Sequence, residues 1–297
     1  MSKTKSLQEL LHHGETFVAP GVYDGWTASL VQEAGFPACA MTGFGVAGSM
    51  GYPDIGLVTQ LEMTQRVEQL CRVLTIPMIV DADTGHGGPN NVARTTRDFA
   101  NAGASGMHLE DQPYPTLCSP GAGKRLTSIA EMQERIAAAV AARPSKNFVV
   151  VARTDAAGVT GIDDAVARGC AYLAAGADVT FVYGLKDDKG MRRYGREVAG
   201  AKLICISAAE TAPRWSVAEL ADAGYSIIGL PANTLMIAAP AVRNFLRQFK
   251  QSGDVTPMLA DMDKVTELNR LMKLDQYVDF EASVQGTVAR LGAGLAA

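Results

Sequence analysis

Four stretches of the chain share one order, in which a helix-like segment closes with Ala-Gly and runs straight into an apolar strand. Glycine suits the left-handed position after a helix, so each pair predicts a joint between a helix and a strand. The four stretches read QEAGFPACAMTG, ANAGASGMHLED, AAGADVTFVYG and ADAGYSIIGLP. With the other short apolar runs, they predict about eight strands, near residues 16–20, 38–43, 76–83, 106–111, 148–155, 178–184, 202–207 and 226–231.

This alternation constrains the fold class. Helical patterns fill the gaps between strands that read as buried and therefore parallel. Eight such units predict an α/β fold, a (β/α)₈ TIM barrel over residues 1–253, and a doubly wound open sheet is the alternative. The segment 254–297 lies beyond the eighth unit, and its helical pattern over 254–285 predicts an additional C-terminal helical tail that serves oligomerisation.

Composition excludes several classes of partner. The net charge is −4 without a block of like charges, which argues against nucleic-acid binding. No apolar run reaches the roughly 20 residues of a membrane span, and the first residues read as an amphipathic helix, not as a signal peptide. Five scattered cysteines predict reduced thiols and a cytoplasmic protein.

Polar residues gather where three neighbouring strands are predicted to end. Asp81 and Asp83 close the third strand, Glu110 closes the fourth and Arg153 lies at the end of the fifth. In a barrel these ends form the catalytic face, and residues i and i+2 of a strand share a side. Close carboxylates repel unless a cation lies between them, and oxygen ligands suit Mg²⁺, with Mn²⁺ also possible.

Structural roles compete with these functional ones. Asp83 could instead cap the following helix, and Arg153 could be an ion-pair partner instead of a clamp for a substrate carboxylate. For His86 and His108 we expect hydrogen-bonded positions in a loop or in the core instead of a role as catalytic base.

The chain resembles the isocitrate lyase and phosphoenolpyruvate mutase superfamily over nearly its whole length, in its 2-methylisocitrate lyase-like or dimethylmalate lyase-like branch. The resemblance rests on DADTGHGGPNNVARTTRDFANAGASGMHLEDQPYP, then a cysteine, GKRL and ARTDA, in this order. It implies a (β/α)₈ barrel, bound Mg²⁺, a small carboxylate substrate, an enolate-like intermediate and homotetramers that exchange C-terminal helices.

The resemblance also implies roles by position. Asp83 would be the inner metal ligand, with Asp81 and Glu110 in its water shell. The catalytic candidates are Cys118, Arg153 and Asp54. The substrate-binding candidates are Thr42, Gly43, Phe44, Arg153, Tyr183, Ser207 and Glu210.

The departures from the family pattern concern the second half of the site. The gating loop 112–126 carries TLCSP where lyases carry K-R-C-G-H, so Cys118 loses neighbouring cations that favour a thiolate. Tyr183 replaces a usual Glu, Ser207 falls on a usual Asn, and Met236 lies where many lyases have Arg. The metal half therefore matches the family, whereas the half that grips further carboxylates is less polar.

The leading interpretation is an Mg²⁺-dependent carbon–carbon bond lyase, of the oxo-acid lyase type. It would cleave a 2-hydroxy di- or tricarboxylate, such as a substituted malate or a 2-methylisocitrate-like acid. The alternatives are an oxaloacetate decarboxylase or hydrolase and a phosphonate mutase or hydrolase. A barrel that binds a metabolite without catalysis is the alternative from outside the enzymes.

Overall fold

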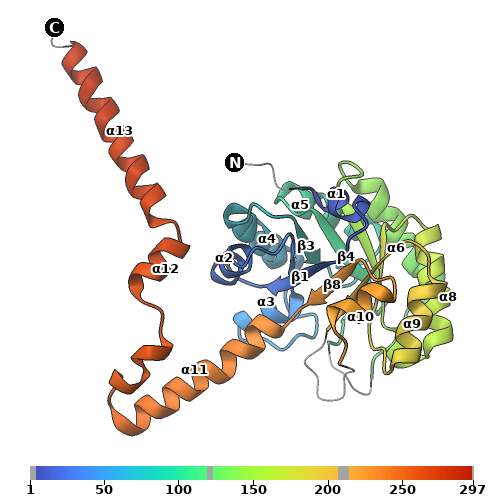
Figure 1. Cartoon of the computed structure of the whole chain (residues 1–297). Coiled ribbons are helices and arrows are strands. Elements are labelled where there is room, and N and C mark those ends of the chain that lie inside the picture. The colour runs from blue at the N-terminus through green and yellow to red at the C-terminus, as the bar shows by residue number, and fades with distance from the viewer. Residues whose placement is uncertain (1–4, 119–122, 207–213, 296–297) are drawn as a thin grey trace. The chain divides into compact units, whose positions relative to one another are not determined.

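Eight parallel strands form a closed barrel with helices around it (Figure 1). The structure is a computed structural model that describes residues 5–118, 123–206 and 214–295. The barrel confirms the predicted fold and excludes the open sheet. Its strands are β1 (Phe17–Val22), β2 (Cys39–Met41), β3 (Met78–Asp81), β4 (Gly106–Glu110), β5 (Val149–Thr154), β6 (Val179–Val182), β7 (Ala201–Cys205) and β8 (Ile227–Leu230).

Several helices of the described chain begin at a side chain that caps their first turn. Ser6, Thr59 and Ser216 each accept a hydrogen bond from the backbone three residues later, and a Glu there bonds back to the cap backbone. The helices are α1 (Leu7–His12), α2 (Gly25–Glu33), α3 (Gly43–Ser49), α4 (Gln60–Val73), α5 (Pro89–Asn101), α6 (Ile129–Ala142), α7 (Ala156–Val159), α8 (Ile162–Ala174), α9 (Asp188–Glu197), α10 (Val217–Asp222), α11 (Asn233–Ser252), η1 (Thr256–Asp261), α12 (Val265–Leu271) and α13 (Leu274–Leu295).

The four Ala-Gly joints are present as predicted. Each alanine is the C-cap of a helix, and each following glycine has a positive φ: 81° at Gly35, 104° at Gly103, 103° at Gly176 and 91° at Gly224. A side chain at these φ values would be strained, which is why glycine ends the helix and releases the chain into the next strand.

The described chain forms two compact units, Met1–Ala238 and Ala239–Ala297. The first holds the barrel. The second consists of helices, as the pattern over 254–285 predicted. The functional division of the chain at residue 253 stays a prediction, as does the role of the tail in oligomerisation. No helix in the described ranges is both long and apolar enough to cross a bilayer. All five cysteines are free, as predicted.

One buried polar network ties β4, β5 and α8 together. The Asp111 carboxylate, fully buried, accepts hydrogen bonds from Arg168 Nη1 at 3.1 Å, from the Tyr172 hydroxyl at 2.8 Å and from the Asp155 backbone N–H at 3.0 Å. Arg168 also donates to the Thr127 carbonyl at 3.0 Å. The network satisfies a buried charge and fixes the chain just after β5.

Arg168→Met should remove about 3–5 kcal/mol from the free energy of unfolding, because it leaves Asp111 buried without a cation. Tyr172→Phe, which removes one hydrogen bond to the same charge, should cost about 1.5–3 kcal/mol. Urea unfolding measures both. As a control, Arg72→Met breaks a surface pair whose arginine side chain is 70% exposed and should change stability little. Equal effects of Arg168→Met and Arg72→Met would contradict the assignment.

Candidate active site

A cavity of about 350 Å³ opens where the barrel strands end. Its volume is in the range of small-molecule sites. Seven of the predicted catalytic, metal-binding and substrate-binding residues line it: Thr42, Phe44, Asp54, Asp81, Cys118, Arg153 and Tyr183. Phe44 and Met236 contribute apolar surface to the same cavity. The predicted substrate-binding and catalytic residues therefore converge, although they come from six different segments of the chain.

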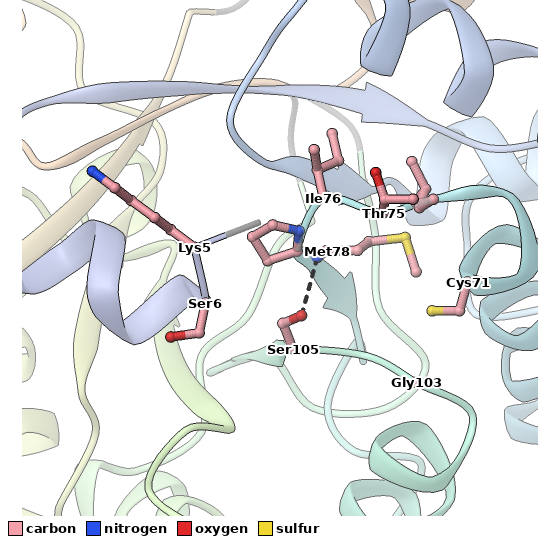
Figure 2. A pocket seen from close by; sticks show the side chains of 10 residues that line it. Lys5, Ser6, Cys71, Thr75, Ile76, Met78, Gly103 and Ser105 are labelled. Carbon is pink, nitrogen blue, oxygen red and sulfur yellow. Dashed lines mark hydrogen bonds between the residues drawn. The ribbon is translucent and has the colours of Figure 1, made fainter. Parts of the chain in front are cut away.

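A second cavity, of about 250 Å³, lies at the opposite end of the strands (Figure 2). Lys5, Cys71 and Thr75 line it together with Ser105, whose hydroxyl accepts a hydrogen bond from the Met78 N–H at 3.3 Å. Its described lining contains no Asp, Glu or His. Catalytic groups of TIM barrels gather at the other face, so we assign the chemistry to the first cavity.

Strand register explains why the acids converge. Asp81 lies opposite His108 on β4, and Glu110 lies opposite Arg153 on β5. His108 and Glu110 are two residues apart on one strand, so all four side chains point to the same, inner side.

The Asp81 carboxylate is held by two backbone N–H groups. Gly43 donates to Oδ2 at 3.2 Å and Asp83 donates to Oδ1 at 3.0 Å. A Cβ atom at residue 43 would lie 2.7 Å from Asp81 Oδ2, so this approach requires glycine. Gly43 thus acts on the site by positioning Asp81, at the start of α3, where Thr42 is the N-cap.

Asp83 corrects one expectation from the sequence. β3 ends at Asp81, and Asp83 has a φ of 47°, so it has left the strand and does not share a face with Asp81 through strand alternation. The left-handed turn places its N–H on the Asp81 carboxylate instead. The alternative role as a helix cap is wrong, because the N-cap of α5 is Gly88, without a side-chain cap bond.

The pKa of Asp83 is governed by its burial and by the acids around it. Burial, together with Asp81 and Asp54, raises the pKa of the Asp83 carboxyl well above its usual value. The Thr116 hydroxyl, at 3.4 Å from Asp83 Oδ1, and Arg153 act in the opposite direction. A buried acid with acidic neighbours is a group that a cation would stabilise in its charged form.

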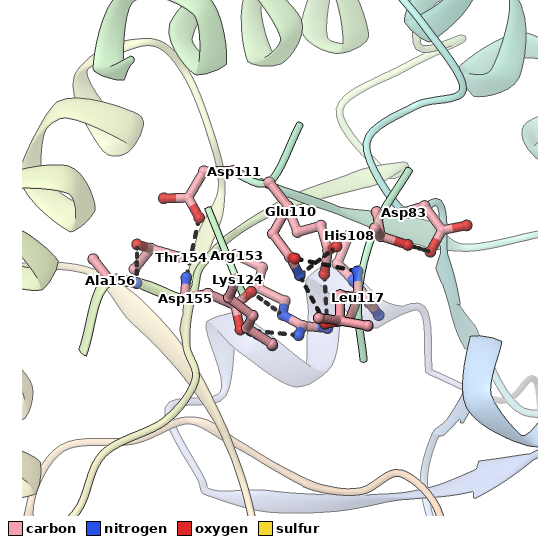
Figure 3. A network of polar contacts seen from close by, with 12 residues as sticks. Asp83, His108, Glu110, Asp111, Leu117, Lys124, Arg153, Thr154, Asp155 and Ala156 are labelled. Carbon is pink, nitrogen blue, oxygen red and sulfur yellow. Dashed lines mark hydrogen bonds and ion pairs between the residues drawn. The ribbon is translucent and has the colours of Figure 1, made fainter. Parts of the chain in front are cut away.

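The sequence left two roles open for Arg153, an ion-pair partner and a clamp for a substrate carboxylate, and its contacts in the structure are compatible with both. It forms ion pairs with Glu110 through Nη1 at 3.0 Å and with Asp155 through Nε at 3.0 Å and Nη2 at 3.2 Å (Figure 3). These contacts account for three of its five N–H donors. Since Arg153 also lines the cavity, its remaining donors can meet a carboxylate of a bound molecule.

The sequence interpretation placed Asp155 among the polar residues at the end of the fifth strand and Lys124 within the GKRL motif, but it assigned neither residue a role in the site. Lys124 Nζ donates to Asp155 Oδ1 at 2.6 Å, and the same carboxylate binds Arg153 (Figure 3). Asp155 follows Arg153 by two residues, which was a usable signal. No local pattern indicated the partner of Lys124, because its contact joins residues 31 positions apart.

Tyr183 stacks on both cations. Its ring centroid lies 4.6 Å from the Arg153 guanidinium carbon and 4.7 Å from Lys124 Nζ. Burial raises the pKa of the Tyr183 hydroxyl to about 12, so it stays neutral. At a position where the family usually has Glu, an uncharged ring therefore covers the two cations.

Cys118 is a buried thiol bonded to an acid. It donates a hydrogen bond to the Asp54 carboxylate, and its backbone N–H donates to the Asp54 carbonyl at 3.2 Å. Burial, with a further contribution from Asp54, raises the pKa of Cys118. The thiolate is therefore disfavoured, but the cause is burial beside Asp54 and not the loss of loop cations by itself, since Arg153 and Lys124 still act to lower the pKa of Cys118.

The two histidines differ from expectation. Neither His86 Nε2 nor His108 Nδ1 has a hydrogen-bond partner among the described residues, although both atoms are buried. His108 Nδ1 lies 3.6 Å from Asp81 Oδ1, beyond hydrogen-bond distance. The expected positions, His86 in a loop and His108 in the core, are present, but the expected hydrogen bonds are not found for these two atoms. His108 lines the cavity, which explains how a buried polar atom can lack a protein partner.

The remaining predicted residues fall into two groups. Asp83 and Glu110 are buried and connect to the cavity through Asp81 and Arg153. Ser207 and Glu210 lie outside the described residues.

The donor set fits Mg²⁺ by its chemistry. Within the described ranges, no three His, Cys, Asp or Glu side chains lie close enough together to hold an ion without other ligands. Mg²⁺ binds through one or two carboxylates and keeps several waters, so it does not need such a cluster. Asp81 and Asp83 supply hard oxygen donors at the mouth, and burial together with the neighbouring acids Asp81 and Asp54 raises the pKa of Asp83.

The comparisons with known proteins agree with this geometry. Residues 7–250 match the family model of phosphoenolpyruvate phosphomutase. The chain is 35% identical over 282 residues to 2,3-dimethylmalate lyase of Eubacterium barkeri, which covers 95% of this chain and 98% of that protein.

Solved structures extend the likeness to the fold. Oxaloacetate acetylhydrolase in complex with 3,3-difluorooxalacetate matches with a TM-score of 0.89 and 30% identity over 96% of this chain and 97% of that one. Phosphonopyruvate hydrolase in complex with oxalate and Mg²⁺ matches with a TM-score of 0.86 and 27% identity, over 95% and 99%. The chain with this barrel and this arrangement of acids belongs to the phosphoenolpyruvate mutase and isocitrate lyase superfamily.

Proposed function

We propose that the protein is an Mg²⁺-dependent lyase that cleaves a carbon–carbon bond of a substituted 2-hydroxy dicarboxylate, with 2-methylisocitrate-like tricarboxylates as the second substrate group. The observation that carries the proposal is that Asp81 and the buried Cys118 thiol line one cavity, with the buried Asp83 bonded to Asp81 directly behind it. The likeness to 2,3-dimethylmalate lyase supports it.

Asp83 and Asp81 would hold the metal, and Glu110 would contribute through water. When bound, Mg²⁺ would polarise a carboxylate and the neighbouring 2-oxygen of the substrate, which stabilises negative charge on that oxygen. Gly43 keeps Asp81 oriented for this contact through its N–H. Glu110 is oriented by Arg153 and by the Gln112 amide, which donates to Glu110 Oε1 at 2.9 Å.

Arg153 and Cys118 would act on the substrate itself. The free N–H donors of Arg153 would bind a second carboxylate. Cleavage moves the proton of the 2-hydroxyl to a base and the electrons of the broken bond to the departing carbon. The Cys118 thiol then gives that carbon a proton, for which the raised pKa is suitable because the thiol is protonated at neutral pH. The products are a 2-oxo acid and a second carboxylate.

Hydrolysis or decarboxylation of oxaloacetate is the second candidate. The chain matches oxaloacetate acetylhydrolase over 96% of its length, and residues 116–120 lack the cations that neighbour the cysteine in lyases. A panel of isocitrate, 2-methylisocitrate, alkylated malates and oxaloacetate, assayed for release of pyruvate, glyoxylate or oxalate with Mg²⁺ and with EDTA, separates the candidates.

Two further features stay predictions. We propose that the tail from residue 254 assembles the chain into homotetramers by exchange of helices, and that the protein is cytoplasmic. Sedimentation of the full chain tests the first.

Asp83→Ala should lower turnover by at least about 100-fold and abolish the response to Mg²⁺, because the inner metal ligand is lost. Steady-state kinetics across an Mg²⁺ titration measures this, and circular dichroism checks the fold. Asp163→Ala, at a side chain that is 88% exposed, is the control and should retain full activity. Full activity in Asp83→Ala would contradict the assignment of Asp83 as the inner metal ligand.

Cys118→Ser should reduce lyase activity by about 10²–10⁴-fold, because the serine hydroxyl is a much weaker acid than the thiol. Oxaloacetate turnover that needs no carbon protonation by residue 118 should largely survive. Cys170→Ser replaces an exposed cysteine and serves as the matched control. Lyase activity that is unchanged in Cys118→Ser excludes the thiol as the acid.

Arg153→Lys should raise KM and lower kcat, together by about 10–100-fold in kcat/KM, since a lysine cannot make the forked contact with a carboxylate. Initial rates over a range of substrate concentrations measure both constants. Arg193→Lys, on the surface of α9, is the control. An unchanged kcat/KM would make Arg153 purely structural.

A further inference from the structure

The inner wall of the barrel is asymmetric. Asp81 points inward, so Ile79, two residues before it, does so too. The strand register shows which residues of β2 and β1 also point inward: Ala40 lies opposite Ile79, and Gly21 lies opposite Ala40. Ala19 therefore also points inward, and Gly229 lies opposite it. On β8, β1 and β2 the inward positions nearest the mouth carry at most a methyl group, whereas Ile227 and Phe17 fill the inward layer below them.

The other half of the wall is filled. There, the inward positions of β5 and β6 carry Val151 and Phe181. The described cavity accordingly extends along the small residues. Ala19, Ala40, Ile79, Leu203 and Gly229 line this part, which we name the hollow. Ala40 is half-buried although it points into the barrel, so the surface it exposes belongs to the cavity.

An unpartnered polar atom stands at the entrance of the hollow. The His108 side chain is 10% exposed and lines the cavity, and its Nδ1 atom lacks a hydrogen-bond partner among the described residues. A buried ring nitrogen without a partner is costly unless something in the cavity meets it. Its position, 3.6 Å from Asp81 Oδ1, is the boundary between the acids and the hollow.

The charged residues that line the cavity limit which chemical groups the hollow can bind. Of the described residues that line the cavity, Arg153 is the one Lys or Arg, and it is bound by Glu110 and Asp155 on the filled side. The hollow itself offers methyl groups, Ile79 and Leu203. A carboxylate there would be buried without a cation, whereas an alkyl group would gain by leaving water.

We infer that the hollow is a subsite for an uncharged alkyl substituent of the acid held at Asp81 and Arg153, and that His108 bonds to an oxygen at the root of this substituent. The inference rests on the proposed function and narrows its substrate class. The substrate is a 2-hydroxy dicarboxylate whose third arm is alkyl, in preference to a tricarboxylate. Ala40 and Gly229 set the length and width of that arm.

The test measures binding instead of turnover. Isothermal titration with Mg²⁺ gives Kd values for oxalate, pyruvate, 2-oxobutyrate and 2-oxopentanoate. In the unaltered protein we expect Kd to fall by about threefold for each added methylene from pyruvate onward. Ala40→Val should remove this gain and leave the Kd of oxalate within about twofold. Ala138→Val, on the outer helix α6, should behave like the unaltered protein.

The outcomes separate the two proposals. If oxalate does not bind in the presence of Mg²⁺, the proposed function fails, and the subsite fails with it. If oxalate binds but Kd does not depend on chain length, the subsite alone is overturned. The same conclusion follows if the chain-length gain persists in Ala40→Val. Even if Ala40→Val does not fold, the dependence of Kd on chain length in the unaltered protein tests the subsite.

His108→Leu tests the hydrogen bond separately. It should weaken the three 2-oxo acids by a similar factor, about fivefold, and leave the gain per methylene unchanged, since the polar contact is at the root of the substituent. A variant that binds pyruvate as tightly as the unaltered protein overturns the role of His108.

Discussion

Buried negative charge governs the mouth of this barrel. Asp54, Asp81, Asp83, Glu110 and Asp155 bring five carboxyl groups to one region, whereas the described cations there are Arg153 and Lys124. Like charges in a poorly hydrated site raise one another's pKa values or require a counter-ion. The direction of the shift at Asp83 shows the first effect in the protein alone, and the second is the physical reason to place a divalent metal there.

The Asp155 carboxylate contacts two cations, Arg153 and Lys124, and holds both in position. The Asp155 backbone N–H donates to the Asp111 carboxylate, and the Asp155 side chain binds Arg153 and Lys124. Tyr183 lies against both cations from the cavity side. A Glu at this position would compete for them as a third acid. The aromatic ring leaves Arg153 with free donors and keeps its charge available to a substrate.

The barrel could be predicted from the sequence because its signals are local. Glycine at Gly35 or Gly103 ends a helix by its own conformation, and the apolar runs that follow are short and evenly spaced. The grouping of Asp81, Glu110 and Arg153 also followed, since strand ends meet at one face. The turn at Asp83 could not be predicted, because its positive φ depends on the N–H bond to Asp81. Likewise, no pattern in the sequence pairs Lys124 with Asp155 across 31 residues, and the empty inner wall is visible only once strand register is known.

The asymmetry of the inner wall has an evolutionary consequence. The acids and the arginine of the candidate site lie at the ends of β3, β4 and β5, whereas the small inward residues belong to β8, β1 and β2. A mutation such as an enlarged side chain at Ala19 or Ala40 changes the shape of the cavity without altering any acid or cation. Mutations that alter substrate preference and mutations that alter reactivity can therefore accumulate independently, because they fall in different segments of the gene. Such modularity offers one route by which a single scaffold could diverge into lyases and hydrolases with different acids as substrates.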